Sequence, residues 1–285
     1  MKGKIKLIEC PRDAMQGWEE WIPTETKISY LNSLLKVGFD TLDFGSFVSA
    51  KAIPQLRDTK EVLAGLDLSG TKTKLLAIVA NVRGAEEASQ YKQINYLGYP
   101  FSVSEEFQRL NTNSTIEESL ERVREIQQIC KNSGKELVIY ISMGFGNPYG
   151  EIWNKDIVIH WVKKLYDEGI RILALSDTIG VSTAENITYL FSNLIPAFPD
   201  VEFGAHLHSD PMTWYEKVEA ASQSGCVRFD SALKGIGGCP MAKNDLVGNL
   251  ATENLVSYFG GISALNLSKE AWEDSFKMAN EIFHS

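Results

Sequence analysis

Short apolar runs rich in β-branched residues alternate along this chain with longer segments of helical periodicity, beginning at Lys4. This alternation predicts parallel strands joined by helices, because a parallel neighbour can be reached only by a long crossover connection. The eight predicted strands are Ile5–Glu9, Thr41–Phe44, Leu75–Ala80, Ile94–Gly98, Leu137–Ser142, Ile172–Ser176, Glu202–His206 and Val227–Ser231.

Helical segments follow these runs and carry start and stop signals. The best-marked start is Ser114, whose side chain we expect to form a capping box with Glu117. Glycines such as Gly38 and Gly134 mark helix ends. The predicted helices are Thr24–Val37, Ala52–Leu63, Ala85–Tyr91, Thr115–Asn132, Lys155–Asp167, Ala184–Leu194, Thr213–Ser222 and Thr252–Phe259.

Eight strand–helix units in roughly 260 residues predict a closed (β/α)8 TIM barrel, and a doubly wound open sheet is the alternative. The segment Ser268–Phe283 predicts an extra C-terminal amphipathic helix that packs on the barrel or on a partner subunit. No Pro-, Gly- or Ser-rich linker interrupts the chain. We therefore expect a single catalytic domain over 1–285, with the barrel at about 4–261 and a helical extension at about 262–285.

Charge and composition narrow the classes of partner. A net charge of −9 disfavours nucleic acid or an anionic membrane, because both require clustered cations. The N-terminus does not read as a signal peptide, and no apolar run approaches the length of a membrane span. The four cysteines form no Cys-x-x-Cys pair. We therefore expect a cytoplasmic protein with free thiols.

The seventh predicted strand leads into a His-x-His pair, His206 and His208. Alternate side chains of a strand point to the same side, so the two rings can reach a common point. Two imidazoles at a strand end suit a divalent metal. The plainer alternative is that each ring only hydrogen-bonds to the backbone, so the surroundings of the pair have to decide.

Unusual polar residues recur where the other predicted strands end. In a TIM barrel the C-terminal strand ends and the loops after them open onto one mouth, where the active site lies. The residues expected at this mouth are Arg12, Asp13, Asp43, Asp177, His206, His208, Cys239 and Asn249.

Asp13 and the two histidines would form a mixed oxygen and nitrogen site for Mg²⁺, Mn²⁺ or Zn²⁺, to which Asn249 could add an oxygen. Asp13 could instead form a salt bridge with Arg12, although consecutive side chains seldom face each other. Asn249 could instead be the N-cap of a helix that follows it.

Three further features have plain alternatives. Asp43 and Asp177 could be structural ion pairs or loop caps rather than catalytic groups. The glycine-rich segment Gly235–Gly238 fits a mobile loop better than a phosphate cradle. Cys239 would then lie on a loop that can close over the mouth.

The segment Cys10–Gln16 reads Cys-Pro-Arg-Asp-Ala-Met-Gln and resembles a Pro-Arg-Asp-Gly-x-Gln signature. Further motifs follow at Ser46–Ser49, Ser114–Ser119, Ser176–Gly180, His206–His208, Gly235–Pro240 and Gly248–Glu253. Together they resemble, in family order, the motifs of the 3-hydroxy-3-methylglutaryl-CoA lyase family of metal-dependent barrel enzymes. Matches in this number and order are far more specific than any one of them.

The resemblance implies a TIM-barrel carbon–carbon lyase that uses Mg²⁺ or Mn²⁺ to cleave 3-hydroxy-3-methylglutaryl-CoA into acetyl-CoA and acetoacetate, as in leucine degradation and ketone-body formation. The reaction would be a retro-Claisen cleavage. The implied metal ligands are Asp13, His206, His208 and Asn249, with Glu253 bracing them. The implied catalytic residues are Arg12 as enolate stabiliser, His206 and Cys239 for proton transfer, and Asp177 and Asp43 in support.

The chain departs from the family pattern at several positions. Asp43 stands where the family usually has Glu, Ala14 replaces the signature glycine, and Ser209–Met212 follows the second histidine. These changes leave the metal and enolate machinery in place and bear on the acyl group that the site accepts.

The resemblance implies a small-molecule acyl-CoA as the partner. A homodimer is one assembly open to the chain, since the extra helix can pack on a partner subunit. The alternative functions are a related acyl-CoA lyase or a synthase that condenses acetyl-CoA with a 2-oxo acid. A third alternative is a non-catalytic barrel that serves as a binding partner.

Overall fold

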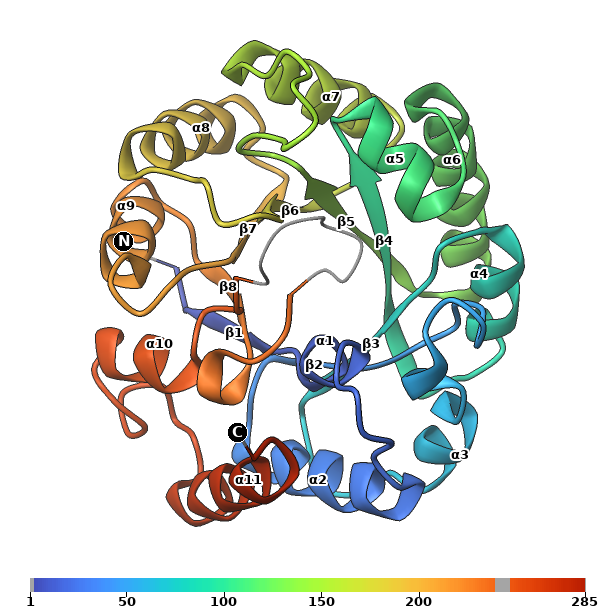
Figure 1. Cartoon of the computed structure of the whole chain (residues 1–285), viewed down its shortest axis with the longest axis vertical. Coiled ribbons are helices and arrows are strands. Elements are labelled where there is room, and N and C mark those ends of the chain that lie inside the picture. Colours follow the sequence, from blue (N-terminus) through green and yellow to red (C-terminus); the bar gives the residue numbers. More distant parts are fainter. Residues whose placement is uncertain (1–2, 239–246, 285) are drawn as a thin grey trace.

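The computed structural model describes residues 3–238 and 247–284, which form a closed barrel of parallel strands inside a ring of helices (Figure 1). Each strand pairs with the next, and the last pairs with the first. The TIM barrel is therefore confirmed and the open sheet is wrong. The strands are β1 (Lys6–Glu9), β2 (Thr41–Ser46), β3 (Lys74–Ile78), β4 (Ile94–Ser102), β5 (Glu136–Ser142), β6 (Ile172–Asp177), β7 (Glu202–Leu207) and β8 (Arg228–Ser231).

The helices lie outside the strands, and two short 3₁₀ helices, η1 and η2, interrupt the loops. In chain order they are α1 (Pro11–Gln16), α2 (Thr24–Val37), η1 (Pro54–Leu56), α3 (Thr59–Ala64), α4 (Val82–Ser89), α5 (Glu105–Thr112), α6 (Ile116–Ser133), α7 (Lys155–Asp167), α8 (Ala184–Ala197), α9 (Trp214–Gln223), η2 (Leu233–Gly235), α10 (Thr252–Tyr258) and α11 (Lys269–Ile282).

The helix predictions fail in three places. Helices α1 and α5 were not predicted, because each is a short helix in a loop that follows a strand. The predicted helix Ala52–Leu63 is divided into η1 and α3, and Pro54 opens η1. A proline lacks the N–H that a helix interior needs, so it is tolerated only in a first turn.

The capping box of α6 lies one residue later than predicted. Thr115 accepts a hydrogen bond from the Glu118 amide at 3.1 Å, and the Glu118 side chain accepts one from the Thr115 amide at 2.8 Å. The predicted pair of Ser114 and Glu117 is wrong. Ser114 is buried, and its hydroxyl forms a hydrogen bond with the Thr112 hydroxyl at 2.8 Å instead of capping the helix.

The barrel interior is divided into an apolar and a polar half. Strands β3 to β6 fill their half with apolar side chains, including Leu76, Val138 and Ile172. Strands β2, β7 and β8 contribute acids and bases to the other half, among them Asp43 and Asp230, both wholly buried. Charge buried in a low-dielectric interior must be paired, so this half is built from linked polar groups.

The C-terminal helix α11 packs on α2 of the same chain (Figure 1). The Ser275 hydroxyl lies 2.9 Å from that of Ser33, and the Trp272 ring contacts Phe39. The predicted extra helix is therefore confirmed, and its apolar face covers the barrel. Among the residues described, none of the helices is both long and apolar enough to span a membrane.

Candidate active site

Three of the four predicted metal ligands converge at the C-terminal mouth of the barrel. Asp13 lies in α1, directly after β1, and His206 and His208 lie at the end of β7. Each offers one ligand atom, and these atoms lie within 4.8 Å of one another. Asn249 joins them, because its Nδ2 donates to Asp13 Oδ2 at 2.6 Å. The four residues thus lie together at the mouth, where the C-terminal ends of the strands meet.

His208 has the chemical form that a metal requires. Its Nδ1 lies 3.2 Å from the Thr178 carbonyl, which can only accept, so Nδ1 carries the proton. Its Nε2 is buried and has no hydrogen-bond partner among the described residues. Burial, together with His206, lowers the pKa of His208 to about 4. A neutral imidazole with an unused lone pair fits a metal ion at this place.

The carboxylate of the group is held ionised. Burial acts to raise the pKa of Asp13, but Arg12 and the two histidines outweigh it, and the pKa is lowered. Asp13 therefore supplies an anionic oxygen and His208 a neutral nitrogen. Burial acts to lower the pKa of His206, but the hydrogen bond and charge of Asp230 outweigh it, and that pKa is raised. That donor set suits a divalent cation of the magnesium, manganese or zinc type.

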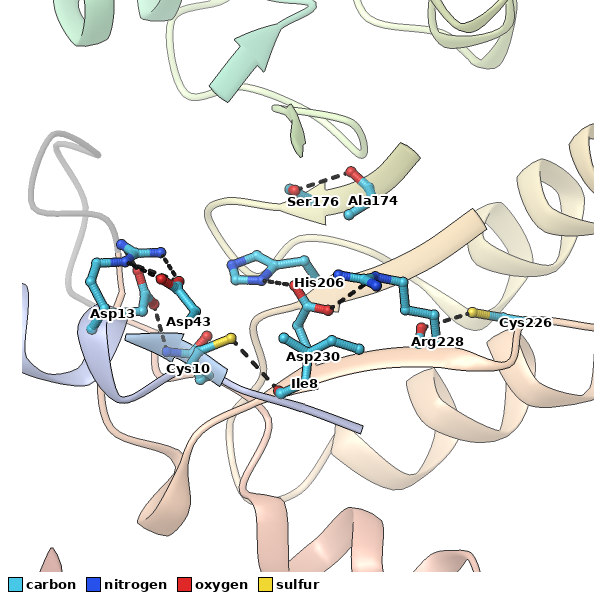
Figure 2. A network of polar contacts seen from close by, with 12 residues as sticks. Ile8, Cys10, Asp13, Asp43, Ala174, Ser176, His206, Cys226, Arg228 and Asp230 are labelled. Atoms are coloured by element: carbon cyan, nitrogen blue, oxygen red, sulfur yellow. Dashed lines mark hydrogen bonds and ion pairs between the residues drawn. The ribbon is translucent and has the colours of Figure 1, made fainter. Parts of the chain in front are cut away.

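A second group of candidate ligands, formed by Cys10, His206 and Asp230, lies close by, again with ligand atoms within 4.8 Å. The Cys10 thiol is fully buried and donates to the Ile8 carbonyl (Figure 2). Burial raises its pKa well above the ordinary value, so it stays protonated. A protonated thiol is a poor ligand, which favours the group that contains Asp13.

Arg12 is locked in place beside this group. Its Nε donates to both oxygens of Asp43, at 3.2 and 2.9 Å, and its Nη1 donates to Asp13 at 3.0 Å. The salt bridge between the consecutive residues Arg12 and Asp13, which we set out as an alternative, is therefore present. Gln16 adds a bond to Nη1 at 2.9 Å.

The shorter carboxylate at Asp43 keeps its contact with Arg12. The two make a forked ion pair with neither side chain more than 9% exposed. Burial raises the pKa of Asp43 to about 6, although Arg12 acts in the opposite direction. The structural ion pair that we set against a catalytic role for Asp43 is therefore present, and it serves to fix Arg12.

The carboxylate of Asp177 accepts hydrogen bonds from the loop that follows β6. It accepts from the Val181 and Ser182 amides at 2.8 and 3.0 Å, and from Lys217 Nζ at 2.9 Å. Lys217 also donates to the His208 carbonyl at 2.8 Å. Asp177 thus caps a loop and, through Lys217, ties the ends of β6 and β7 together, which is the loop-cap alternative.

Glu253 and Asn249 have different surroundings from those predicted. Glu253 accepts from the Lys234 amide at 3.1 Å and so holds η2. Helix α10 begins after Ala251, so the alternative that Asn249 caps it is wrong. The predicted proton-transfer residue Cys239 lies outside the described residues.

Gly237 passes close over the metal group. Its φ is +115°, and a Cβ placed there would lie 2.3 Å from Asn249 Nδ2 and 3.0 Å from Asp13 Oδ2. Only glycine combines that backbone angle with so close an approach. The glycine of the Gly235–Gly238 segment is therefore required by the Asp13–Asn249 contact.

A pocket opens at this mouth and combines polar with apolar walls. Arg12, Asp13, His206 and His208 line it together with apolar side chains from the loops after β2 and β4. The apolar members include Val48, Ala52, Ile53 and Phe107. Such a pocket suits a ligand with a charged reacting end and a long, mostly apolar body.

Three residues of the site's surroundings were missed from the sequence. Asp230 lies 3.2 Å from His206 Nδ1, and Arg228 lies behind Asp230 (Figure 2). A signal was present: the two charges are spaced by two residues in a predicted buried strand, so both point to the same side. Tyr140 was also missed, and its ring packs edge-on against His206.

A closed (β/α)8 barrel with a carboxylate, two imidazoles and a fixed guanidinium at its C-terminal mouth defines a barrel enzyme. The HMGL-like family model matches residues 4–265, and the chain belongs to this family.

Among curated relatives, hydroxymethylglutaryl-CoA lyase YngG of Bacillus subtilis is 34% identical over 254 residues, covering 89% of this chain and 84% of the relative. The mitochondrial hydroxymethylglutaryl-CoA lyase of Mus musculus is 33% identical over 273 residues, covering 93% and 82%.

Solved structures of such enzymes have the same fold. The HMG-CoA lyase of Bacillus subtilis has a TM-score of 0.88 at 31% identity, covering 98% of this chain and 93% of that one. An HMG-CoA lyase of Acinetobacter baumannii, in complex with coenzyme A and 3-methylmalate, has a TM-score of 0.89 at 28% identity, covering 98% and 90%.

Proposed function

We propose that this chain is a carbon–carbon lyase that cleaves 3-hydroxy-3-methylglutaryl-CoA into acetyl-CoA and acetoacetate. The relatives compared above carry this activity in their names. The observation in the chain itself that carries the proposal is the guanidinium of Arg12, fixed by Asp43 and Asp13 at the wall of a pocket shared with the two histidines.

The reaction requires a base to take the proton of the substrate's C3 hydroxyl. The C2–C3 bond then breaks, C3 becomes the ketone of acetoacetate, and the bonding electrons move to C2 to give the enolate of acetyl-CoA. A proton delivered to C2 completes the products. The hardest species to stabilise is the enolate, whose negative charge resides largely on the thioester oxygen.

Arg12 would meet that charge. Its side chain is already oriented by Asp43, so little reorganisation is needed when the enolate forms. A preorganised cation beside a developing oxyanion stabilises the transition state more than the ground state. We therefore assign enolate stabilisation to Arg12 and its orientation to Asp43.

Asp13, His206, His208 and Asn249 would hold a divalent cation, Mg²⁺ or Mn²⁺. When bound there, such an ion polarises the substrate oxygens and makes the hydroxyl proton more acidic. The unused lone pair of buried His208 Nε2 supports this assignment.

We assign the two proton transfers to His206 and Cys239. Asp177 supports them by joining the ends of β6 and β7 through Lys217, which also donates to the His208 carbonyl. Glu253 would brace the site from further away, through the turn that precedes the glycine-rich segment.

The pocket supports an acyl-CoA as the substrate class. Its polar residues would bind the reacting acyl end, and its apolar wall would pack along the pantetheine arm. The relative from Acinetobacter baumannii was solved with coenzyme A. The condensing-synthase and scaffold alternatives receive no comparable support.

Three further assignments remain predictions: a single domain, a homodimer and a cytoplasmic location. The names of the relatives include both cytoplasmic and mitochondrial lyases. A role in leucine degradation or ketone-body formation would follow from the proposed reaction and its products.

Replacing Arg12 with Met tests the proposal, because Met keeps most of the length of the side chain and removes its charge. We expect acetoacetate release from 3-hydroxy-3-methylglutaryl-CoA to fall by about 10²-fold or more in kcat, as for removal of one oxyanion donor, with a smaller change in KM. Arg57→Met, which changes an arginine that stacks on Trp21, is the matched control. Equal activity of Arg12→Met and wild type would contradict the role of Arg12.

A further inference from the structure

A line of alternating charges runs through the polar half of the barrel to His206. At its far end Lys6 forms an ion pair with Glu202. Arg228 Nη1 donates to Glu202 Oε1 at 3.1 Å, and Arg228 Nε lies 3.9 Å from Asp230 Oδ1. The other oxygen of Asp230 lies 3.2 Å from His206 Nδ1. Figure 2 shows Asp230 between Arg228 and His206.

The side chain of Arg228 has a defined place inside the barrel. Its side chain is wholly buried, although a buried cation is costly unless it is paired. Gly204 of the neighbouring strand leaves room for it, since a Cβ there would lie 2.9 Å from Arg228 Cδ. Arg228 Nε and Nη2 have no hydrogen-bond partner among the described residues. The two carboxylates of Glu202 and Asp230 therefore determine where the cation lies.

The consequence falls on the His206 ring. An ionised carboxylate only accepts hydrogen bonds, so Asp230 selects the tautomer in which Nδ1 carries the proton. Nε2 is then the nitrogen with the free lone pair, and His206 offers a ligand atom within 4.8 Å of those of Asp13 and His208. Figure 2 shows the ring directed toward Asp13 and away from Arg228. A hydrogen bond to the second nitrogen commonly sets the orientation of a ligating histidine.

We infer that Arg228 and Asp230 are positioning residues, which hold His206 in its Nδ1–H tautomer so that Nε2 faces the metal group. Asp230 acts directly on the ring, and Arg228 acts through Asp230 by keeping it in place as an acceptor. The metal role of His206 rests on the proposed function. The tautomer itself can be measured without substrate or metal.

The test uses the full-length protein labelled with ¹⁵N-histidine and freed of metal. The chain has only four histidines, and loss of one signal in His206→Gln assigns His206 in long-range ¹H–¹⁵N spectra. We expect Nδ1–H in the wild type. In Asp230→Asn and Arg228→Met we expect the Nε2–H tautomer to gain population, and Mn²⁺ affinity measured by EPR to weaken by roughly 10–100-fold.

Three variants separate positioning from loss of stability. Arg228→Lys keeps the charge and should restore most of the wild-type tautomer and affinity. Gly204→Ala displaces Arg228 by crowding and should shift the tautomer in the same direction as Arg228→Met. Lys135→Met removes a buried cation that bonds the Tyr91 and Ile94 carbonyls, and it should change stability but not the tautomer.

Two results would overturn the inference. One is a wild-type His206 that carries its proton on Nε2. The other is a tautomer and Mn²⁺ affinity that stay within twofold of wild type in both Asp230→Asn and Gly204→Ala. Neither result depends on cleavage of 3-hydroxy-3-methylglutaryl-CoA. The inference can therefore fail while the proposed reaction holds, and the proposed reaction can fail while the inference holds.

Discussion

At the level of single residues, Glu9 in β1 is a buried acid that lies outside the group of predicted site residues. It is wholly buried and accepts from the Leu233 amide at 2.8 Å and from the Thr252 hydroxyl. Burial raises its pKa to about 8 from an ordinary value of 4.5. Between these two pH values the folded state binds more protons than the unfolded state, so Glu9 makes stability fall as pH rises.

Glu9→Gln should remove this dependence, because glutamine is neutral and of the same shape. As pH rises from 5 to 8.5, the free energy of unfolding of the variant should increase relative to that of the wild type, by at most about 1.4 kcal/mol per pH unit. Urea unfolding at both pH values measures the difference. Glu25→Gln, at an exposed position, serves as control. If the free energies of unfolding of Glu9→Gln and wild type differ by the same amount at both pH values, the raised pKa of Glu9 is contradicted.

The sequence allowed the metal group to be predicted, because Asp13, His206 and His208 each lie where a strand ends. It did not allow the partners of Arg12 and His206 to be chosen. Both partners lie on the neighbouring strand, Asp43 on β2 beside β1 and Asp230 on β8 beside β7. The register between neighbouring strands, which decides which side chains meet, is not encoded in local spacing. Asp230 was visible only as an acid inside a strand.

At the level of elements, the strands were predicted more accurately than the helices. A buried parallel strand is an apolar run with sharp ends, whereas α1 and α5 are short and lie within loops. The capping box of α6 was misplaced by one residue, because two neighbouring residues, Ser114 and Thr115, can both act as N-caps and only tertiary contacts decide between them.

Thr115→Ala tests that assignment. Loss of the cap should lower the free energy of unfolding by about 1 kcal/mol. Glu117→Ala, at the position that the sequence favoured, should change it by less than about 0.5 kcal/mol because the side chain is exposed. Chemical denaturation of both variants measures this, and a larger loss for Glu117→Ala would reverse the assignment.

At the level of the whole molecule, α11 packs against the helical ring of the barrel. Its buried residue Ser275 touches Ser33 of α2, and Phe283 packs on Trp18 and Tyr30 near the mouth. These contacts link α11 and the residue after it to the segment that follows α1, the helix that carries Arg12. They support the prediction of a single domain.

Ser275→Leu should therefore destabilise the entire protein. The added volume in a packed interface should lower the free energy of unfolding by about 1–3 kcal/mol. The far-UV and tryptophan signals should then show one common unfolding transition at a lower temperature. The exposed Asp274→Leu on the same helix is the control. A separate early transition confined to the tryptophan signal would instead indicate that α11 is an independent extension.

The polar half of the barrel is the feature that makes this fold an enzyme. A TIM barrel needs only an apolar filling for stability, yet here β2, β7 and β8 bring buried acids and bases to the C-terminal mouth. Arg12 and His206 are each held by an acid behind them, Asp43 and Asp230. In the proposed reaction both groups would therefore be oriented before substrate binds.

The central claim is metal-dependent cleavage of one acyl-CoA, and product analysis of metal-stripped protein tests it most directly. Protein treated with a chelator and returned to Mg²⁺ or Mn²⁺ should convert 3-hydroxy-3-methylglutaryl-CoA into acetyl-CoA and acetoacetate in equal amounts, while the stripped protein should convert almost none. Equal rates with and without metal, or turnover only of a different 3-hydroxyacyl-CoA, would contradict the account.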